Sequence, residues 1–167
     1  MNGDAAAAVE HDAARLGDAL RRHGWRLASA ESCTGGLVAA ACTALAGSSD
    51  WFERGFVTYS NAAKTESLGV PAALIDAHGA VSEAAACAMA AGALARSQAQ
   101  LAVAVTGIAG PGGAVPGKPV GTVWLGLAAA GRAPRAERLQ LAGDRTAVRA
   151  ETVRIALRRL VALAEGA

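Results

Sequence analysis

A short apolar run, Trp25–Ala30, leads directly into the turn Glu31-Ser-Cys-Thr-Gly-Gly36, and the small-residue segment Leu37–Leu45 follows it. This order predicts a strand, a tight turn and a helix that ends near Gly47. A strand joined so closely to a helix is a building unit of α/β folds, in which helices cover a sheet. The unpaired N–H groups at the start of such a helix favour an anion in the turn.

The alternation of helices and strands continues along the chain. Helices are expected over about residues 5–23, 61–68, 71–77, 82–96 and 144–164, and strands over 52–59, 101–105, 121–129 and 135–141. The last two strands form an antiparallel-looking pair across Gly131, which predicts a mixed sheet flanked by helices in a three-layer-like α/β arrangement. The chain of 167 residues shows no internal repeat and no linker, so residues 1–167 are expected to form a single domain.

Charge and hydropathy argue against two classes of partner. The net charge of +2 is too small to indicate nucleic-acid binding, and the arginines of the last helix are interpreted as a solvated face: Arg149, Arg154, Arg158 and Arg159. No uncharged run reaches the roughly 18 residues of a membrane span. The N-terminus lacks the basic start and apolar block of a signal peptide. We therefore expect neither a nucleic-acid nor a membrane partner.

The three cysteines, Cys33, Cys42 and Cys87, are widely spaced and show neither a CxxC pair nor histidines at metal-ligand spacing. This pattern argues against a disulfide framework and against a zinc site. We expect a cytoplasmic protein without a metal or a cofactor. Cys33 is a candidate nucleophile because a helix N-terminus lowers a thiol pKa, but small buried cysteines are common.

Lysine is rare in this chain, since only Lys64 and Lys118 are lysines among 16 basic residues. Arginine stays protonated in proteins, whereas a lysine with a lowered pKa serves as a base. If Asn61 is the N-cap, Lys64 lies in the first turn of its helix, where the helix dipole favours the neutral amine. Lys64 is therefore a candidate general base, with an ordinary surface lysine as the alternative.

Two serine sites are candidate partners for such a base. Ser32 follows the first strand and could hold a phosphate or an oxyanion, although helix capping explains a serine there equally well. Ser48 and Ser49 follow a helix and could supply the hydroxyl of a Ser/Lys hydrolase. The three histidines show no triad spacing. Tyr59, five residues before Lys64, could hydrogen-bond into the site or belong to the core.

The loop that begins at Thr106-Gly-Ile-Ala-Gly-Pro-Gly-Gly113 follows a buried strand. Its glycines permit close approach of the backbone to a ligand, but the loop matches neither a Walker A pattern nor a dinucleotide fingerprint. Arg145 follows the expected N-cap Asp144, where a cation opposes the helix dipole. An anionic partner, either a substrate phosphate or a protein carboxylate, explains this arginine better.

Together these segments resemble one family closely, the C-terminal domain family of CinA proteins. The resemblance covers about residues 8–163 and is carried, in order, by AESCTGG at Ala30–Gly36, GSS with WF at 47–52, YSN with Lys64, HGAVSE at His78–Glu83, TGIAGP at Thr106–Pro111, KPVGTV at Lys118–Val123 and GDR at Gly143–Arg145. Several blocks of six residues in register make it highly specific.

The resemblance implies an amidohydrolase that deamidates nicotinamide mononucleotide to nicotinate mononucleotide and ammonia, a step in pyridine-nucleotide recycling. It implies that Ser49, or its neighbour Ser48, is the nucleophile, that Lys64 is its base and that Tyr59 assists proton transfer. The substrate-binding positions would be Ser32, Thr34, Gly35, Gly36, Thr106, Gly107, Gly110 and Arg145. Self-association is common in such proteins, and the Ala-rich segment Ser82–Arg96, expected to be an exposed helix, could pack against a second copy.

The main alternative is a non-catalytic module that binds a nucleotide or a protein partner in competence or DNA damage. A serine paired with a lysine base argues against it, because binding alone does not require that pair. A metal-dependent pyrophosphatase would need an acidic cluster, and Glu31, Asp50, Glu53 and Asp144 are scattered along the sequence.

Overall fold

Five strands form one mixed sheet in the computed structural model, which describes residues 3–166. Their order is β2-β1-β3-β4-β5. Strand β1 (Leu27–Glu31) lies between β2 (Phe52–Val57) and β3 (Leu101–Gly107), and both neighbours run parallel to it. Strands β4 (Thr122–Ala129) and β5 (Arg135–Gln140) continue the sheet in antiparallel pairing. The mixed sheet predicted from the sequence is thus confirmed.

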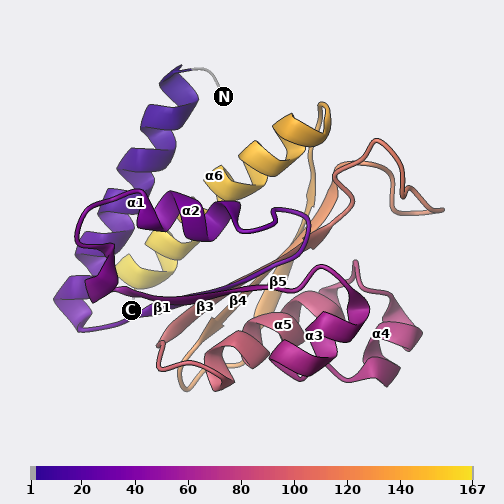
Figure 1. Cartoon of the computed structure of the whole chain (residues 1–167), viewed down its shortest axis with the longest axis horizontal. Helices are drawn as coiled ribbons and strands as arrows, with labels where there is room; N and C mark the ends of the chain where they lie inside the picture. Colours follow the sequence, from indigo (N-terminus) through magenta and orange to yellow (C-terminus); the bar gives the residue numbers. More distant parts are fainter. Residues whose placement is uncertain (1–2, 167) are drawn as a thin grey trace.

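Helices cover both faces of the sheet (Figure 1). One face carries α1 (Gly3–His23), α2 (Leu37–Thr43) and α6 (Arg145–Glu165). The other face carries α3 (Asn61–Leu68), α4 (Ala72–His78) and α5 (Glu83–Ala95). A single 3-10 turn, η1 (Ser48–Asp50), connects α2 to β2. No helix in residues 3–166 is long and apolar enough to cross a membrane.

The two faces of the sheet have different cores. Large side chains of α1 and α6, among them Leu16, Leu20 and Leu157, pack with Trp51 on the first face. The second face is built from alanines of β1 and β3 against Leu68 of α3 and Met89 of α5. Small residues there let α5 lie very close to the strands. The low aromatic content of the sequence therefore corresponds to close packing of α5 on the sheet.

Helix α5 is covered on several sides, which contradicts the expectation that this Ala-rich helix is exposed. Six of its residues are buried: Ala85, Ala86, Met89, Ala90, Gly92 and Ala93. It packs against β3, β4, α3 and α4. A Cβ atom built on Gly92 would lie 2.1 Å from the carbonyl oxygen of Leu68, the last residue of α3. Gly92 is therefore the residue that lets α3 dock on α5.

Gly92→Ala should lower the free energy of unfolding by about 1–3 kcal/mol, because the new methyl group overpacks a helix–helix contact. This loss outweighs the gain in helix propensity, which is about 1 kcal/mol. Gly112→Ala is the control, since a Cβ there meets nothing within 4 Å. Urea denaturation of both variants measures the difference, and equal stability would contradict the proposed packing role of Gly92.

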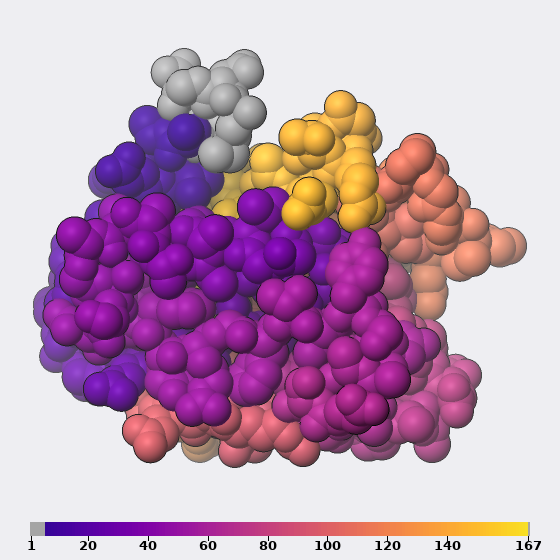
Figure 2. All heavy atoms as spheres, in the orientation of Figure 1, coloured from indigo at the N-terminus to yellow at the C-terminus, as the bar shows by residue number. Residues whose placement is uncertain are grey.

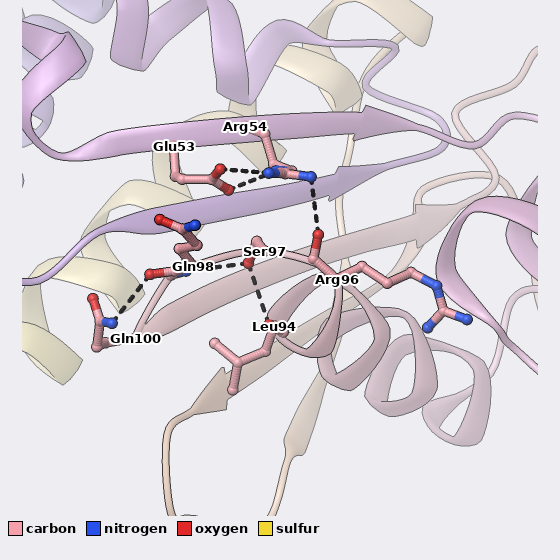
Figure 3. A network of polar contacts seen from close by, with 8 residues as sticks. Glu53, Arg54, Leu94, Arg96, Ser97, Gln98 and Gln100 are labelled. Carbon is pink, nitrogen blue, oxygen red and sulfur yellow. Dashed lines mark hydrogen bonds and ion pairs between the residues drawn. The ribbon is translucent and has the colours of Figure 1, made fainter.

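A polar network ties the edge strand β2 to the end of α5 (Figure 3). Arg54 of β2 donates through Nη1 to the carbonyl oxygen of Arg96 at 3.0 Å and pairs with Glu53 at 2.6 Å. The hydrogen bonds from Arg54 hold the pKa of Glu53 below its usual value. Arg96 in turn donates to the carbonyl oxygen of Leu68 at 2.7 Å. Strand β2, α5 and the C-terminal end of α3 are thus fastened together.

Several element ends differ from their predicted positions. Ser60, rather than Asn61, is the N-cap of α3, and its hydroxyl accepts from the N–H of Ala63 at 3.0 Å. Strand β2 ends before Tyr59, and α2 ends before Leu45. Strand β3 includes two residues that were expected to begin a loop, Thr106 and Gly107. The predicted N-cap Asp144 is confirmed, and the helix expected from residue 82 begins with Ser82 as its N-cap.

Candidate active site

The carboxyl ends of β1, β2 and β3 meet at one edge of the sheet, on the right in Figure 1. The chain leaves β1 through α2 on one face and leaves β2 through α3, α4 and α5 on the other. The strand order therefore changes direction between β1 and β3. Ligands of open α/β sheets bind at such a switch point, outside the carboxyl ends of the strands.

Lys64 and Ser32 meet at this edge. The Nζ atom of Lys64, on α3, lies 3.1 Å from the Oγ atom of Ser32, the residue that follows β1. The Lys64 side chain is 1% exposed and Ser32 is 9% exposed. Among the side chains of residues 6–166, Lys64 forms no ion pair with a carboxylate. A buried lysine amine and a buried hydroxyl are therefore in direct contact.

Two carbonyl oxygens orient the Lys64 amine. Its Nζ atom donates to the carbonyl oxygens of Thr58 at 2.9 Å and Tyr59 at 3.4 Å. A neutral amine has two N–H donors, so donation to both carbonyls turns its lone pair toward Ser32 Oγ. Burial lowers the pKa of Lys64 from the ordinary lysine value, while the neighbouring Cys33 opposes this shift. Desolvation, and not the helix dipole invoked from the sequence, is thus the leading cause of the shift.

The turn after Ser32 is held by the carboxylate of Glu31, a residue that is 1% exposed. One carboxylate oxygen accepts from the N–H groups of Gly36 and Val38, both at 3.0 Å. The other accepts from the N–H of Ala39 at 2.8 Å and the hydroxyl of Ser29 at 3.2 Å. The carboxylate therefore occupies the N-terminus of α2 itself. The anion expected at those N–H groups is thus the chain's own Glu31 carboxylate.

The turn also places backbone N–H groups beside Ser32. The N–H groups of Cys33 and Thr34 donate to no other residue in the part of the chain that the structure describes, and the N–H of Cys33 faces its own sulfur. Thr34 is fully buried, and its hydroxyl has no partner there. Burial raises the pKa of the Cys33 thiol to about 11, so this thiol stays protonated and is a poor nucleophile. Ser32 is the better nucleophile of the two.

Arg145 connects three segments around the site. Its guanidinium donates to the carbonyl oxygen of Gly110 at 3.0 Å and to the hydroxyl oxygen of Tyr59 at 2.9 Å. It forms no ion pair in the part of the chain that the structure describes. The Tyr59 hydroxyl is therefore engaged by Arg145, and Tyr59 meets Lys64 through its main-chain carbonyl instead.

Arg149, one turn after Arg145 on α6, was not predicted as a site residue. Its Nη2 atom donates to the carbonyl oxygen of Thr34 at 3.0 Å, and its Nε atom is buried without a partner within residues 3–166. The other three arginines of the expected solvated face do pair with acids: Arg154 with Glu151, Arg158 with Asp12 and Arg159 with Glu137. The solvated-face interpretation is wrong for Arg149. Its spacing of four from Arg145 was the available signal.

The structure does not bring Ser49 to Lys64. Ser49 lies in η1, before the first residue of β2, whereas Lys64 binds the carbonyl that follows its last residue. The six residues of β2 separate the two ends by about 18 Å. In Figure 1 the segment joining α2 to β2 is on the left and α3 is on the right. Ser48 shares the position of Ser49, so the expected Ser49–Lys64 pairing, with either serine, is contradicted by this geometry.

The remaining predicted positions surround the site in different ways. The buried hydroxyl of Thr106 donates to the carbonyl oxygen of Ala80 at 2.7 Å and so braces the wall of the site. A Cβ on Gly107 would lie 2.8 Å from Val123, so this glycine serves strand packing. Gly35 and Gly36 adopt positive φ angles in the turn. Gly110 offers its carbonyl to Arg145.

Comparisons with known proteins bear on this site. The family model described as the CinA C-terminal domain matches residues 9–164. The nicotinamide-nucleotide amidohydrolase PncC of Pseudomonas putida is 54% identical over 151 residues, which is 90% of this chain and 94% of that protein. The enzyme with the same name from Escherichia coli K12 is 49% identical over 146 residues, covering 87% of this chain and 88% of that protein.

Solved structures show the same fold. The competence/damage inducible protein CihA of Agrobacterium tumefaciens superimposes with a TM-score of 0.91 at 47% identity, covering 93% of this chain and 95% of that chain. A CinA superfamily protein from Klebsiella pneumoniae also gives a TM-score of 0.91, at 39% identity over 95% of this chain and 99% of that chain.

Proposed function

Because the chain belongs to the CinA C-terminal domain family, we propose that it is a nicotinamide-nucleotide amidohydrolase in which Ser32 is the nucleophile and Lys64 is the base. The activity is the one named for relatives that are 49% and 54% identical over nearly the whole chain. The observation that supports the mechanism is the buried contact of 3.1 Å between Lys64 Nζ and Ser32 Oγ.

In the first half of the reaction, Ser32 Oγ attacks the carboxamide carbon and its proton passes to the neutral Lys64 amine. The carbonyl oxygen becomes an oxyanion beside the N–H groups of Cys33 and Thr34. Stabilisation by such donors is worth about 3 kcal/mol each. When the carbon–nitrogen bond breaks, Lys64 returns the proton to the departing nitrogen, and ammonia leaves an ester on Ser32.

In the second half, water attacks the ester carbon and gives a proton to Lys64, which then protonates Ser32 Oγ as the carbon–oxygen bond breaks. The products are the nicotinate nucleotide and a regenerated dyad. The net reaction consumes one amide and one water and releases one carboxylic acid and one ammonia. Lys64 carries the proton in both halves, which requires its amine to be neutral at the start.

Arg145 is the proposed ligand of the substrate phosphate. Its guanidinium lies at the site, and it donates only to uncharged oxygens within residues 3–166. Tyr59 holds this guanidinium through its hydroxyl. The walls around the site are formed by the other predicted substrate-binding positions: Thr34, Gly35, Gly36, Thr106, Gly107 and Gly110. In this proposal Tyr59 positions Arg145 and, through its carbonyl, Lys64.

The cellular setting and the oligomeric state are parts of the proposal. We place the reaction in cytoplasmic pyridine-nucleotide recycling, and the three cysteines are free thiols, as a reducing compartment favours. Self-association remains proposed, through a surface other than the covered face of α5. Light scattering of the purified protein measures it.

The test of the activity is release of ammonia from nicotinamide mononucleotide by the purified protein, with and without a chelator. We expect release that the chelator does not change and an equimolar amount of nicotinate mononucleotide. Absence of release would favour a binding module. Loss of release with the chelator would favour a metal-dependent hydrolase.

The rate should depend on pH through Lys64. Because burial lowers the pKa of this amine, the base becomes neutral at a lower pH than an ordinary lysine. We expect kcat/KM to rise with pH through that lowered pKa and to level off below the ordinary value of 10.5. A profile of initial rates against pH measures this, and a rate that still rises above the ordinary lysine pKa would contradict it.

A further inference from the structure

A cavity of about 580 Å³ lies on the α5 side of the sheet. It forms where the end of α4 and the start of α5 meet β4, β5 and the loop 108–121. Its walls include four residues of the segment His78–Glu83 and, from the segment Lys118–Val123, Lys118; both segments stand out in the sequence. The Ser32–Lys64 dyad uses no side chain from either segment. The cavity is therefore a feature that deamidation does not explain.

Two cations at this cavity lack acidic partners in the described structure. Lys118 Nζ donates to the carbonyl oxygen of His78 at 3.3 Å, and Arg138 Nη2 donates to that of Gly117 at 2.8 Å. Neither forms an ion pair with the side chains described over residues 6–166, whereas six other arginines do: Arg15, Arg21, Arg54, Arg154, Arg158 and Arg159. Both cations keep free N–H donors, and Glu83 is the single carboxylate among the residues that line the cavity. This arrangement favours an anion.

The cavity also has an apolar wall. Trp124 of β4 is half-buried there, and Val81 and Cys87 lie beside it. An indole with one accessible side offers a surface on which a flat ring stacks. The volume of about 580 Å³ is within the range of small-molecule sites. An anion that carries an aromatic ring, as a nucleotide does, satisfies both parts of the wall.

The loop 108–121 contributes both to this cavity and to the contacts of Arg145. Near its start, Gly110 accepts from Arg145 of the proposed substrate site, and near its end Lys118 lines the cavity. Figure 2 shows this loop, in orange, projecting from the body of the molecule. The two sites thus use opposite ends of one loop and different cations.

We propose that this cavity is a second ligand site that binds an aromatic anion of the nucleotide class, with Lys118 and Arg138 on the phosphate and Trp124 against the ring. The proposal goes beyond the deamidase activity and does not depend on it. The phosphate would replace the weak contacts of both cations to carbonyl oxygens. A nucleotide bound to Lys118 would also contact the loop 108–121, which contains Gly110.

The test is calorimetric titration of the full chain with adenosine monophosphate, which carries no carboxamide. We expect the Lys118→Met/Arg138→Met variant to bind it about tenfold more weakly or worse, since two charged hydrogen bonds are lost. Adenosine and inorganic phosphate, each lacking one half of the ligand, should also bind about tenfold more weakly. Binding should quench the fluorescence of the wild type and leave that of Trp124→Leu unchanged.

Three controls separate this site from the dyad and from general charge effects. Arg132→Met removes an exposed arginine from the β4–β5 turn and should leave binding unchanged. Arg145→Met removes the proposed substrate ligand and should retain adenosine monophosphate binding at this cavity. The Lys118→Met/Arg138→Met variant should keep its melting temperature and its kcat/KM for deamidation.

Unchanged affinity in the double variant would overturn the proposal, as would phosphate binding as tightly as the nucleotide. A raised KM for deamidation in the double variant would also overturn it, because the cavity would then belong to the substrate site. The calorimetric and fluorescence results do not depend on turnover by Ser32, so failure of the deamidase proposal is recognised separately.

Discussion

Lys64→Met is expected to lower kcat for deamidation by about 10³-fold or more, because it removes the only proton carrier proposed for both half-reactions. Lys64→Arg should be equally inactive, since a guanidinium stays protonated. The methionine retains the apolar stem within the buried site. Steady-state assays with nicotinamide mononucleotide measure the loss, and Lys118→Met is the matched control because it removes the other lysine of the chain.

The same variant separates catalysis from stability. In the wild type the pKa of Lys64 is lower in the folded state than in the unfolded chain, so the unfolded state binds more protons between the two values. The free energy of unfolding should therefore rise with pH in that window, and the penalty on the folded state should be full below it. Lys64→Met should lack this rise. Near-normal turnover in either Lys64 variant would contradict the base assignment.

Ser32→Ala is expected to lose activity to a similar extent, about 10³-fold or more, because no acyl ester forms without the hydroxyl. Ser49→Ala should stay within about twofold of the wild type, since exposed positions away from a site tolerate substitution. Ser49 precedes β2, and Ser32 follows the neighbouring strand β1, so the two serines lie near opposite ends of β2. Ser49→Ala is therefore a matched control for Ser32→Ala. Loss of activity in Ser49→Ala with an active Ser32→Ala would overturn the assignment made from the structure.

Trapping the ester gives an independent measurement of the nucleophile. Rapid acid quench of the wild type during turnover, followed by digestion with chymotrypsin, which can cut after Leu37 and Leu45 between the candidate serines, and mass spectrometry should place a nicotinoyl nucleotide on the peptide containing Ser32. The peptide containing Ser48 and Ser49 should remain unmodified. Modification of that peptide instead would show that the hydroxyl contact to Lys64 is not the reactive one.

Much of the fold could be predicted because local patterns determine it. The strand–turn–helix at 25–45 and the caps Ser82 and Asp144 depend on neighbouring residues only. The burial of α5 could not be predicted, because an Ala-rich helix has no apolar stripe to distinguish its faces. Close packing at Gly92, which depends on a residue of α3, decides that burial.

The candidate site was predicted in part for a similar reason. The scarcity of lysine identified Lys64 from chemistry alone, and Arg145 followed from an unfavourable helix position. To predict the partner of Lys64, one must know which end of β2 faces α3. The residues next to Ser32 or Ser49 in the sequence do not determine this. The role of Glu31 could not be predicted either. Its carboxylate accepts hydrogen bonds from the start of α2 only once α2 has folded back over the turn.

Because Lys64 is buried, the rate at which its amine is chemically labelled measures local opening of the structure around it. Its two lysines differ in access, because one amine is enclosed and the other lies at a cavity on the surface. An acylating reagent should therefore modify Lys118 rapidly and Lys64 only when α3 separates from the end of β1. The ratio of the two labelling rates would measure the free energy of that local separation in the native protein.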